Sequence, residues 1–255
     1  MAFPEWVRRI VQPAASAAVT LVAAATTMAW MSSGRTNKEL VERLAAAGYA
    51  GHPRVVDAML HVDRGWFCKH LPYEDHPVSI GHGATISAPH MHGHALTHLE
   101  PYLQPGAIAL DVGSGSGYLV ACMAYMVGPT GTVVGVEHVD ALTAESRVAL
   151  DRANQQLPNN LGSMIVVTGD GRKGYPERAP YDCIHVGAAA GSRPDTLLEQ
   201  LKPGGALYTP EVIHGGEQVI MLYKRLKGGG FERKELLPVR YVPLTDLDLQ
   251  LRDAY

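Results

Sequence analysis

The chain has 255 residues, of which 46% are hydrophobic and 18% charged, and its formal net charge at pH 7 is -3. This length and composition suffice for one domain with a sizeable buried core. The weak negative charge gives no general attraction to nucleic acid or to anionic membranes, so we expect neither as a partner. Cys68, Cys122 and Cys183 lie far apart without C-x-x-C spacing, which favours an intracellular protein with unpaired thiols over a disulfide framework.

The N-terminal residues differ in composition from the rest of the chain. No residue from Ile10 to Gly34 is charged, alanine dominates, and Arg8 and Arg9 stand just before this run. The run is interrupted by polar residues, which argues against a membrane span, and Glu5 with few basic residues argues against a transit peptide. We expect residues 1–35 to be a flexible or processed extension of a cytoplasmic protein, or of an organellar one if they act as a transit peptide.

The body of the chain opens with helical patterns. In the segment 36–49, Thr36 is followed three residues later by Glu39, which predicts a capped helix start. The segment 55–62 continues the helical pattern. We therefore predict an N-terminal helical segment ahead of the first strand of the main sheet.

Short apolar runs then alternate with helical stretches. We predict strands at 107–112, 131–137, 164–170, 181–187 and 205–212. We predict helices between them at 118–128, 140–156 and 193–202. The last two apolar runs, 217–226 and 235–244, are joined by three consecutive glycines and predict an antiparallel hairpin. Since apolar strands alternating with helices form parallel sheets covered on both faces, residues 36–255 are predicted to be a single doubly wound α/β domain with a mostly parallel sheet.

A glycine-rich loop follows the first predicted strand. In "LDVGSGSGYL", Asp111 precedes Gly113, Gly115 and Gly117, at the point where a helix begins. This spacing departs from the dinucleotide fingerprint, in which the third glycine lies one residue later, so an NAD oxidoreductase is the weaker alternative. An acid before the loop suits the ammonium group of S-adenosylmethionine, which we expect as cofactor.

Two further acids follow successive strands. Glu137 ends the second strand, where it could accept hydrogen bonds from two ribose hydroxyls. Asp170 ends the third strand within "GDG", where an adenine amine could be met. Carboxyl ends of parallel strands meet at one edge of the sheet, so these acids and the glycine loop are predicted to form one binding site.

The segment "ATISAPHMHGHA", from Ala84 to Ala95, combines one serine with alternate histidines. The histidines here and shortly beyond are His90, His92, His94 and His98. They suggest a zinc site as an alternative, but the segment contains no cysteine or acidic ligand, so we expect no metal. Pro89 and Gly93 predict a loop around these two residues. His94 and His98, which would share one face of a following helix, are expected to be ordinary helix-surface residues.

Six stretches together resemble the protein-L-isoaspartate (D-aspartate) O-methyltransferase family. They are "SIGHGATISAPHMH", "LDVGSGSG", "GDGR", "APYDCIHVGAAA", "LKPGG" and "YVPLTD". The resemblance implies a Rossmann-like, S-adenosylmethionine-dependent methyltransferase that repairs damaged proteins. Such an enzyme methylates the free carboxyl of L-isoaspartyl and D-aspartyl residues in peptides and proteins, and releases S-adenosyl-L-homocysteine. We expect it to act as a monomer.

The resemblance also implies roles for individual residues. Ser87 matches the family's active-site serine. The positions that match cofactor-lining residues are Thr85, Ile86, Ala88, His92, Ser116, Glu137, His138, Asp170, Gly171, Thr245 and Gln250. The last two imply that residues 241–250 fold back over the site. The sequence departs from the family pattern at 191–193 and at Glu211 and Val212, which we expect to alter the rim that receives the peptide.

The expected chemistry suits these residue types. A carboxylate with a pKa of about 4 is already a nucleophile at neutral pH, so no general base is needed and Ser87 is expected to orient the acceptor. The methyl ester would then be displaced by the neighbouring backbone nitrogen, giving a succinimide whose hydrolysis returns some normal aspartyl.

Two other classes of protein fit the sequence less well. A nitrogen-directed methyltransferase would carry an Asn/Asp-Pro-Pro-aromatic turn after the fourth strand, where this chain has "VGAAAG". A non-catalytic, methyltransferase-like substrate adaptor is the alternative from a different functional class. Such adaptors carry a long C-terminal extension, whereas few residues follow 241–250 here.

Overall fold

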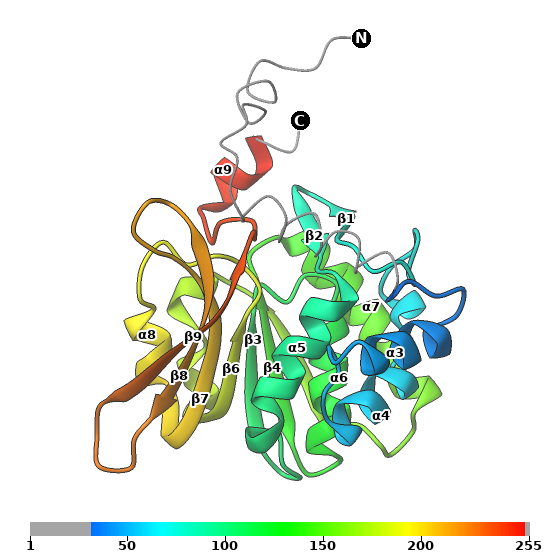
Figure 1. Ribbon diagram of the computed structural model, residues 1–255, viewed down its shortest axis with the longest axis horizontal. Coiled ribbons are helices and arrows are strands. Elements are labelled where there is room, and N and C mark those ends of the chain that lie inside the picture. Colours follow the sequence, from blue (N-terminus) through cyan, green and yellow to red (C-terminus); the bar gives the residue numbers. More distant parts are fainter. Residues whose placement is uncertain (1–31, 253–255) are drawn as a thin grey trace.

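The structure, a computed structural model, describes residues 32–252 (Figure 1). Residues 1–31 of the expected extension, with Arg8 and Arg9, lie outside the described part, so the expectation of a flexible or processed extension stays a prediction. The first described residues contact a later loop: the Asp75 amide donates to Ser33 Oγ at 2.9 Å, and the Gly34 amide donates to the Tyr73 carbonyl at 2.8 Å. No helix within 32–252 is long and apolar enough to cross a membrane.

Two short helices form the predicted N-terminal helical segment. The first, α3 (Asn37–Ala46), begins as predicted, because Thr36 Oγ1 accepts a hydrogen bond from the Glu39 amide at 3.2 Å. A turn at Gly48, with φ +82°, then redirects the chain. The second helix, α4 (Pro53–His61), is followed by a single turn of 3-10 helix, η1 (Arg64–Trp66).

The segment with the alternate histidines is a strand followed by a helix. Strands β1 (Val78–Gly81) and β2 (Ala84–Ile86) form a separate antiparallel hairpin, and α5 (Pro89–Leu99) follows directly. The predicted loop is therefore wrong. Pro89 occupies the first helical position, where no amide donor is needed, and Gly93 allows close packing, since a Cβ there would lie 2.8 Å from the Tyr49 carbonyl oxygen.

The main sheet has seven strands in the order β5-β4-β3-β6-β7-β8-β9. Its parallel strands are β3 (Ile108–Val112), β4 (Thr132–Glu137), β5 (Ser163–Thr168), β6 (Tyr181–Val186) and β7 (Leu201–Val212). Strands β8 (Gln218–Arg225) and β9 (Phe231–Val239) add the predicted antiparallel hairpin. Because β3 pairs with both β4 and β6, the order reverses beside β3, which places a crevice at its carboxyl end. The predicted doubly wound fold is confirmed.

Helices cover both faces of this sheet. On one face lie α5, α6 (Tyr118–Val127) and α7 (Asp140–Gln156), with α3 and α4 outside them, and on the other lies the short α8 (Asp195–Glu199) (Figure 1). The helix predicted at 193–202 is shorter because β7 already begins at Leu201. The remaining 3-10 turns are η2 (Glu100–Tyr102), η3 (Gly171–Lys173) and η4 (Pro176–Arg178).

The chain beyond the hairpin leaves the sheet earlier than predicted. The second strand ends at Val239, and the Leu244 amide donates to the Ala189 carbonyl while the Ala189 amide donates to the Val242 carbonyl, both at 2.8 Å. The final helix, α9 (Leu247–Arg252), lies at the same end of the sheet as the β1–β2 hairpin (Figure 1). Residues 240–252 therefore extend over the crevice.

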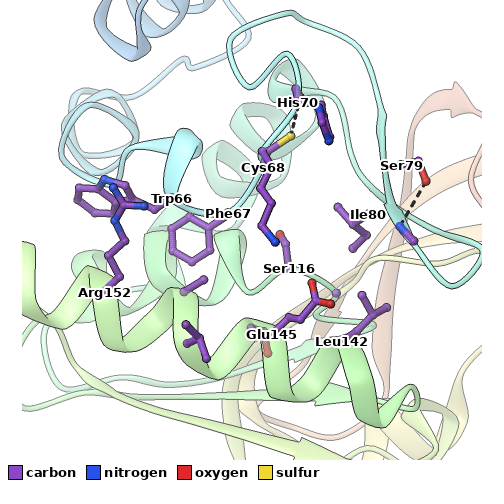
Figure 2. Close-up of a pocket in the computed structure, with 16 residues that line it drawn as sticks. Trp66, Phe67, Cys68, His70, Ser79, Ile80, Ser116, Leu142, Glu145 and Arg152 are labelled. Carbon is purple, nitrogen blue, oxygen red and sulfur yellow. Dashed lines mark hydrogen bonds between the residues drawn. The ribbon is translucent and has the colours of Figure 1, made fainter.

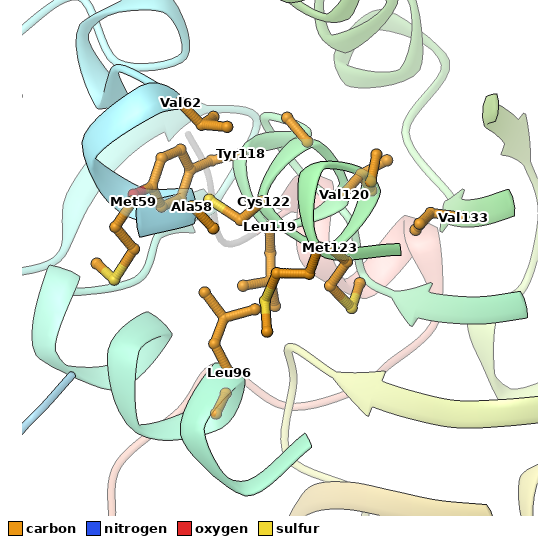
Figure 3. Close-up of a cluster of buried hydrophobic side chains, with 14 of the residues drawn as sticks. Ala58, Met59, Val62, Leu96, Tyr118, Leu119, Val120, Cys122, Met123 and Val133 are labelled. Atoms are coloured by element: carbon orange, nitrogen blue, oxygen red, sulfur yellow. The ribbon is translucent and has the colours of Figure 1, made fainter. Parts of the chain in front are cut away.

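Helix α6 lies at the centre of the larger core. Nine of its ten residues are buried, and it packs against α4, α5 and the sheet, so it is apolar all round. Figure 3 shows the surrounding side chains, which include Ala58, Met59 and Val62 of the α4 region, Leu96 of α5 and Val133 of β4. This packing fixes the N-terminus of α6, and with it the glycine loop that precedes the helix.

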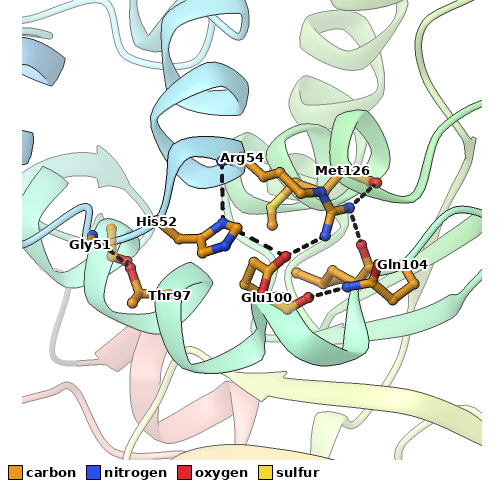
Figure 4. A network of polar contacts seen from close by, with 9 residues as sticks. Gly51, His52, Arg54, Thr97, Glu100, Gln104 and Met126 are labelled. Carbon is orange, nitrogen blue, oxygen red and sulfur yellow. Dashed lines mark hydrogen bonds and ion pairs between the residues drawn. The ribbon is translucent and has the colours of Figure 1, made fainter.

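A polar network ties α4 to this core (Figure 4). Arg54 Nη1 contacts Glu100 Oε1 at 2.5 Å, and Nη2 donates to the carbonyls of Leu103 and Met126 at 2.6 and 2.8 Å. The two carbonyls belong to the ends of neighbouring elements, which leave carbonyl oxygens without partners in the helix. Arg54 thus joins α4, the 3-10 turn that follows α5, and α6 at the end of the molecule remote from the crevice.

Candidate active site

The glycine loop lies at the carboxyl end of β3, as predicted. Gly113, Gly115 and Gly117 have φ values of +72°, +48° and +84°, a region of backbone conformation that side chains disfavour. Gly117 precedes the first residue of α6, and a Cβ there would lie 3.3 Å from Leu150 and Ser146 of α7. The loop therefore needs glycine for its turn and for its close approach to α7.

Glu137 lies at the end of β4, directly beside this loop. Its Oε2 accepts a hydrogen bond from the Gly115 amide at 2.9 Å, and its Oε1 accepts one from the Val139 amide at 3.0 Å. The residue is only 5% exposed. Each carboxylate oxygen can accept a further hydrogen bond, so Glu137 is oriented by the backbone and can still receive two hydroxyl groups.

Asp111 is held by a partner that the sequence interpretation missed. His185 of β6 stands opposite Asp111 in the sheet register, and its Nδ1 lies 2.7 Å from Asp111 Oδ1. Both side chains are buried, and the His185 ring stacks on Tyr208 at 5.7 Å between centroids. A histidine within an apolar strand signals a buried polar pair, but the partner lies 74 positions earlier in the chain.

Two adjoining hollows at this crevice collect the predicted residues. The outer hollow is lined by Thr85, Gly113, Gly115, Glu137, His138, Asp170, Gly171, Thr245 and Gln250, among others. The inner hollow is lined by Thr85, Ile86, Ser87, His92, Asp111, Gly113, Gly115 and Ser116, with Tyr118 and His185 beside them. Of the predicted residues, only Ala88 and Gly117 line neither. Ala88 is buried at the start of α5, and Gly117 faces α7.

Residues 241–250 cover the outer hollow, as predicted. His138 Nε2 donates to Gln250 Oε1 at 2.9 Å, and Gln250 Nε2 donates to the His82 carbonyl at 3.0 Å. Arg172 bridges Asp246, at 2.6 Å, and Asp170, at 2.9 Å. Hydrogen bonds from Arg172 hold the pKa of the Asp170 carboxyl below its usual range. Asp170 is thus an anchor for the covering segment as well as a lining residue.

Ser87 follows β2 and is half-buried in the inner hollow. Its carbonyl accepts a hydrogen bond from Arg64 Nη2 at 2.9 Å. Burial raises the pKa of the Tyr241 phenol to about 12, although the nearby Ser87 side chain opposes this shift. Ser87 therefore lies between a fully buried cation and the segment that closes the crevice.

The four histidines of the α5 segment do not converge. His90 pairs with the buried Asp75 at 2.8 Å, His92 contacts Arg64 at 3.3 Å, and His98 Nδ1 donates to the His94 carbonyl at 2.9 Å. Within residues 32–252, no group of three or more His, Cys, Asp or Glu is arranged to hold a metal.

His94 was expected to be an ordinary surface residue, and this is wrong. Its Nδ1 lies 2.8 Å from the Tyr208 hydroxyl, since α5 packs against β7. Burial lowers the pKa of His94 to about 4, so it is neutral at physiological pH.

Glu211 does not lie on an exposed rim, contrary to expectation. It is 5% exposed, and its Oε1 accepts a hydrogen bond from the Tyr223 hydroxyl at 2.7 Å. Its neighbour Val212 is exposed. Arg193 extends over the rings of Tyr223 and Phe231, at 5.9 and 5.3 Å from their centroids, so Arg193 and Glu211 both contact side chains of β8 and β9.

A third cavity, of about 550 Å³, adjoins the inner hollow at Gly115 and Ser116 (Figure 2). Its walls include Trp66 and Phe67, Ile80 of β1, and Leu142 and Glu145 of α7. The sequence interpretation missed this cavity. Its lining residues run from Trp66 to Arg152, 86 positions along the chain, and apart from the glycine loop they share no motif, so no local signal points to it.

Comparison with known proteins agrees with this geometry. Residues 35–249 match the family model for protein-L-isoaspartate(D-aspartate) O-methyltransferase (PCMT). The chain is 47% identical to protein-L-isoaspartate O-methyltransferase of Caenorhabditis elegans, over 88% of this chain and 98% of that protein. It is 46% identical to protein-L-isoaspartate O-methyltransferase 1 of Arabidopsis thaliana, over 87% and 96% of the two chains.

Among solved structures, the beta-aspartate methyltransferase (PCMT) of Plasmodium falciparum in complex with S-adenosyl-L-homocysteine has a similar fold. The TM-score is 0.75 at 36% sequence identity, and the match covers 83% of this chain and 99% of that one. The crevice at the reversal beside β3, with its glycine loop and strand-end acids, defines an S-adenosylmethionine-dependent methyltransferase. More narrowly, the chain belongs to the protein-L-isoaspartate(D-aspartate) O-methyltransferase family.

Proposed function

We propose that this chain repairs damaged proteins by methylating the free carboxyl of L-isoaspartyl and D-aspartyl residues, with S-adenosylmethionine bound across the two hollows. One observation carries the proposal. The acids that end β3 and β4 flank the glycine loop, and the Ser87 segment meets Asp111 at the inner hollow and, through Thr85, Glu137 at the outer one. Family membership supports the same reaction.

The residues present suit the cofactor. Glu137 offers two oriented carboxylate oxygens to a ribose, and Asp111 offers a buried negative charge for an ammonium group. Gly113 leaves open space beside the loop, since a Cβ there would meet only the Gly187 backbone, at 3.9 Å. When bound, the cofactor supplies a methyl group activated by a positively charged sulfur.

The protein's own residues then orient the acceptor carboxylate and exclude water from the site. The acceptor carboxylate needs no proton removed, so Ser87 acts by donating a hydrogen bond that aims one oxygen. The negative charge of the acceptor carboxylate and the positive charge of the sulfonium both disappear as the methyl is transferred. A poorly hydrated site therefore favours the transition state over the separated ions. The covering segment 241–250 and the buried aromatic Tyr118 provide such a site. Later loss of the ester to a succinimide needs no group on the protein.

The oligomeric state and the cellular location of the protein are further proposals. Action as a monomer is one of these proposals. The buried, unpaired thiols of Cys68, Cys122 and Cys183 are compatible with the proposed cytoplasmic location. A non-catalytic adaptor would not need the strand-end acids, the glycine loop and Ser87 together, so we favour the enzyme.

Mass spectrometry can test the proposed transfer. The purified protein is incubated with S-adenosylmethionine and an isoaspartyl peptide, and the peptide is examined for the mass of one added methyl group that alkali removes. An alkali-labile methyl ester is expected. A peptide that stays unmodified while the protein binds S-adenosyl-L-homocysteine would favour the adaptor.

A further inference from the structure

Arg64 is the largest fully buried polar side chain of the described residues, and it lies behind the inner hollow. It is 0% exposed, and among residues 32–252 it forms no ion pair with a carboxylate. The nearby buried Asp75 is instead hydrogen-bonded to His90. Since a buried charge that no carboxylate contacts directly costs free energy, this arrangement calls for a functional reason.

The guanidinium contacts two residues of the candidate site. Its Nη2 donates to the Ser87 carbonyl at 2.9 Å, and its Nη1 lies 3.3 Å from His92 Nδ1. The group also lies over the Tyr118 ring, 5.5 Å from the centroid, and its Nε has no partner among the described residues. Ser87 and His92 both line the inner hollow, so Arg64 reaches the site through them.

This contact decides which nitrogen of His92 carries the proton. A guanidinium can only donate, so Nδ1 of His92 must present its lone pair. The proton of the neutral ring is then on Nε2, the nitrogen not held by Arg64. A neutral Nε2–H group is a hydrogen-bond donor in a hollow that must receive carboxylates.

The surroundings also keep this imidazole neutral. Burial, followed by the positive charge of Arg64 and the nearby His185 and His90, holds the pKa of His92 well below its usual range. Asp111, which is paired with His185, lines the same hollow, and the Tyr118 phenol is a further ionisable neighbour, whose ring centroid lies 5.0 Å from that of His92. Burial raises the pKa of Tyr118, so this neighbour also stays neutral.

We propose that Arg64 is a positioning residue for methyl transfer, which anchors the Ser87 backbone and fixes His92 as a neutral Nε2–H donor to a carboxylate in the inner hollow. The carboxylate belongs either to the isoaspartyl acceptor or to the amino-acid part of the cofactor. This inference rests on the proposed function.

A neutral donor suits the reaction better than a cation in direct contact. The acceptor carboxylate loses its negative charge as the methyl is transferred, so a direct ion pair would stabilise the ground state more than the transition state. Arg64 makes no such direct ion pair, because His92 lies between its guanidinium and the hollow. It supplies positive potential and rigidity, while His92 makes the contact.

Three variants separate the contributions of Arg64. Arg64→Gln keeps an amide donor and removes the charge, and Arg64→Met removes both. Arg147→Met is the matched control, since this exposed arginine also donates to a backbone carbonyl, Val166, but lies away from the hollow. The readouts are the His92 tautomer by NMR of 15N-histidine-labelled protein and the steady-state constants for an isoaspartyl peptide.

The wild-type protein should show His92 as the Nε2–H tautomer, unprotonated throughout the range in which exposed histidines titrate. Arg64→Met should raise the pKa of His92, so that protonation and a loss of kcat appear together on the acid side. Its kcat/KM at neutral pH should fall about tenfold or more, while Arg64→Gln should retain part of the activity. Weaker S-adenosyl-L-homocysteine binding would assign the carboxylate to the cofactor, and a raised KM for peptide would assign it to the acceptor.

A wild-type His92 with its proton on Nδ1 would overturn the inference, as would a folded Arg64→Met with unchanged tautomer and kcat. If Arg64→Met does not fold, the His92 tautomer of the wild-type protein and the kinetics of Arg64→Gln still test the inference. The tautomer is read without substrate or cofactor. Absence of methyl transfer in the wild-type protein would therefore contradict the proposed function and leave the tautomer result standing.

Discussion

Replacement of Glu137 tests whether the end of β4 binds the cofactor. Its carboxylate holds the Gly115 and Val139 amides and faces the outer hollow. Hydrogen bonds to a charged group contribute roughly 1.5–3 kcal/mol. Since about 1.4 kcal/mol corresponds to a factor of ten, Glu137→Ala should bind S-adenosyl-L-homocysteine roughly ten- to a hundredfold more weakly.

The same change leaves two backbone amides without acceptors, so stability must be measured separately. Calorimetric titration gives the affinity, and urea unfolding gives the free energy of unfolding. Glu145→Gln is the control, because Glu145 lies on α7 and lines the neighbouring cavity instead; its affinity should match the wild type. Unchanged affinity in a folded Glu137→Ala protein would refute the assignment of Glu137 to the ribose.

The other predictions concern the acceptor, the scaffold, the N-terminus and metals. Ser87→Ala should bind S-adenosyl-L-homocysteine almost normally and lose roughly ten- to a hundredfold in turnover, whereas a methylated Ser87 by mass spectrometry would reveal a covalent route. Arg54→Met should lower the free energy of unfolding by about 2–3 kcal/mol in urea, because it leaves Glu100 and two carbonyls without their donor; a smaller loss would show that water replaces the network. A chain that begins at Met28 should keep wild-type activity and melting temperature, since it retains the contacts of Ser33 and Gly34; loss of either would place the missing residues in the fold. Treatment with a chelator should leave activity unchanged, and inhibition reversed by added zinc would revive the metal hypothesis.

The sheet could be predicted from the sequence because its signals are local. The parallel strands are continuous apolar runs, and the predicted bounds of β3, β4 and β6 agree with the observed ones to within one residue. The glycine loop follows β3 directly, so its place at the crevice follows from the order of the elements. The β1–β2 hairpin and the helix at Pro89 are not predicted, since short strands and a proline are equally typical of a loop.

The partners of the site residues could not be predicted in the same way. His185 and Asp111 meet only because β6 and β3 are neighbours in a particular register. Arg64 reaches Ser87 from a turn 23 positions earlier, with no pattern that marks it. Glu211 is expected at the rim because the sequence departs there from the family pattern, whereas packing of β7 against β8 turns it inward. The family resemblance implies which residues line the site, whereas the partners that orient them are visible only in the tertiary structure.

The most direct test of the central claim compares two peptides that differ only in the linkage of one aspartyl residue. Initial rates of methyl transfer from labelled S-adenosylmethionine are measured for the isoaspartyl peptide and its normal aspartyl counterpart. We expect alkali-labile methyl ester on the isoaspartyl peptide and only background on the other. Equal transfer to both peptides, or transfer to neither by protein that binds the cofactor, would contradict the account.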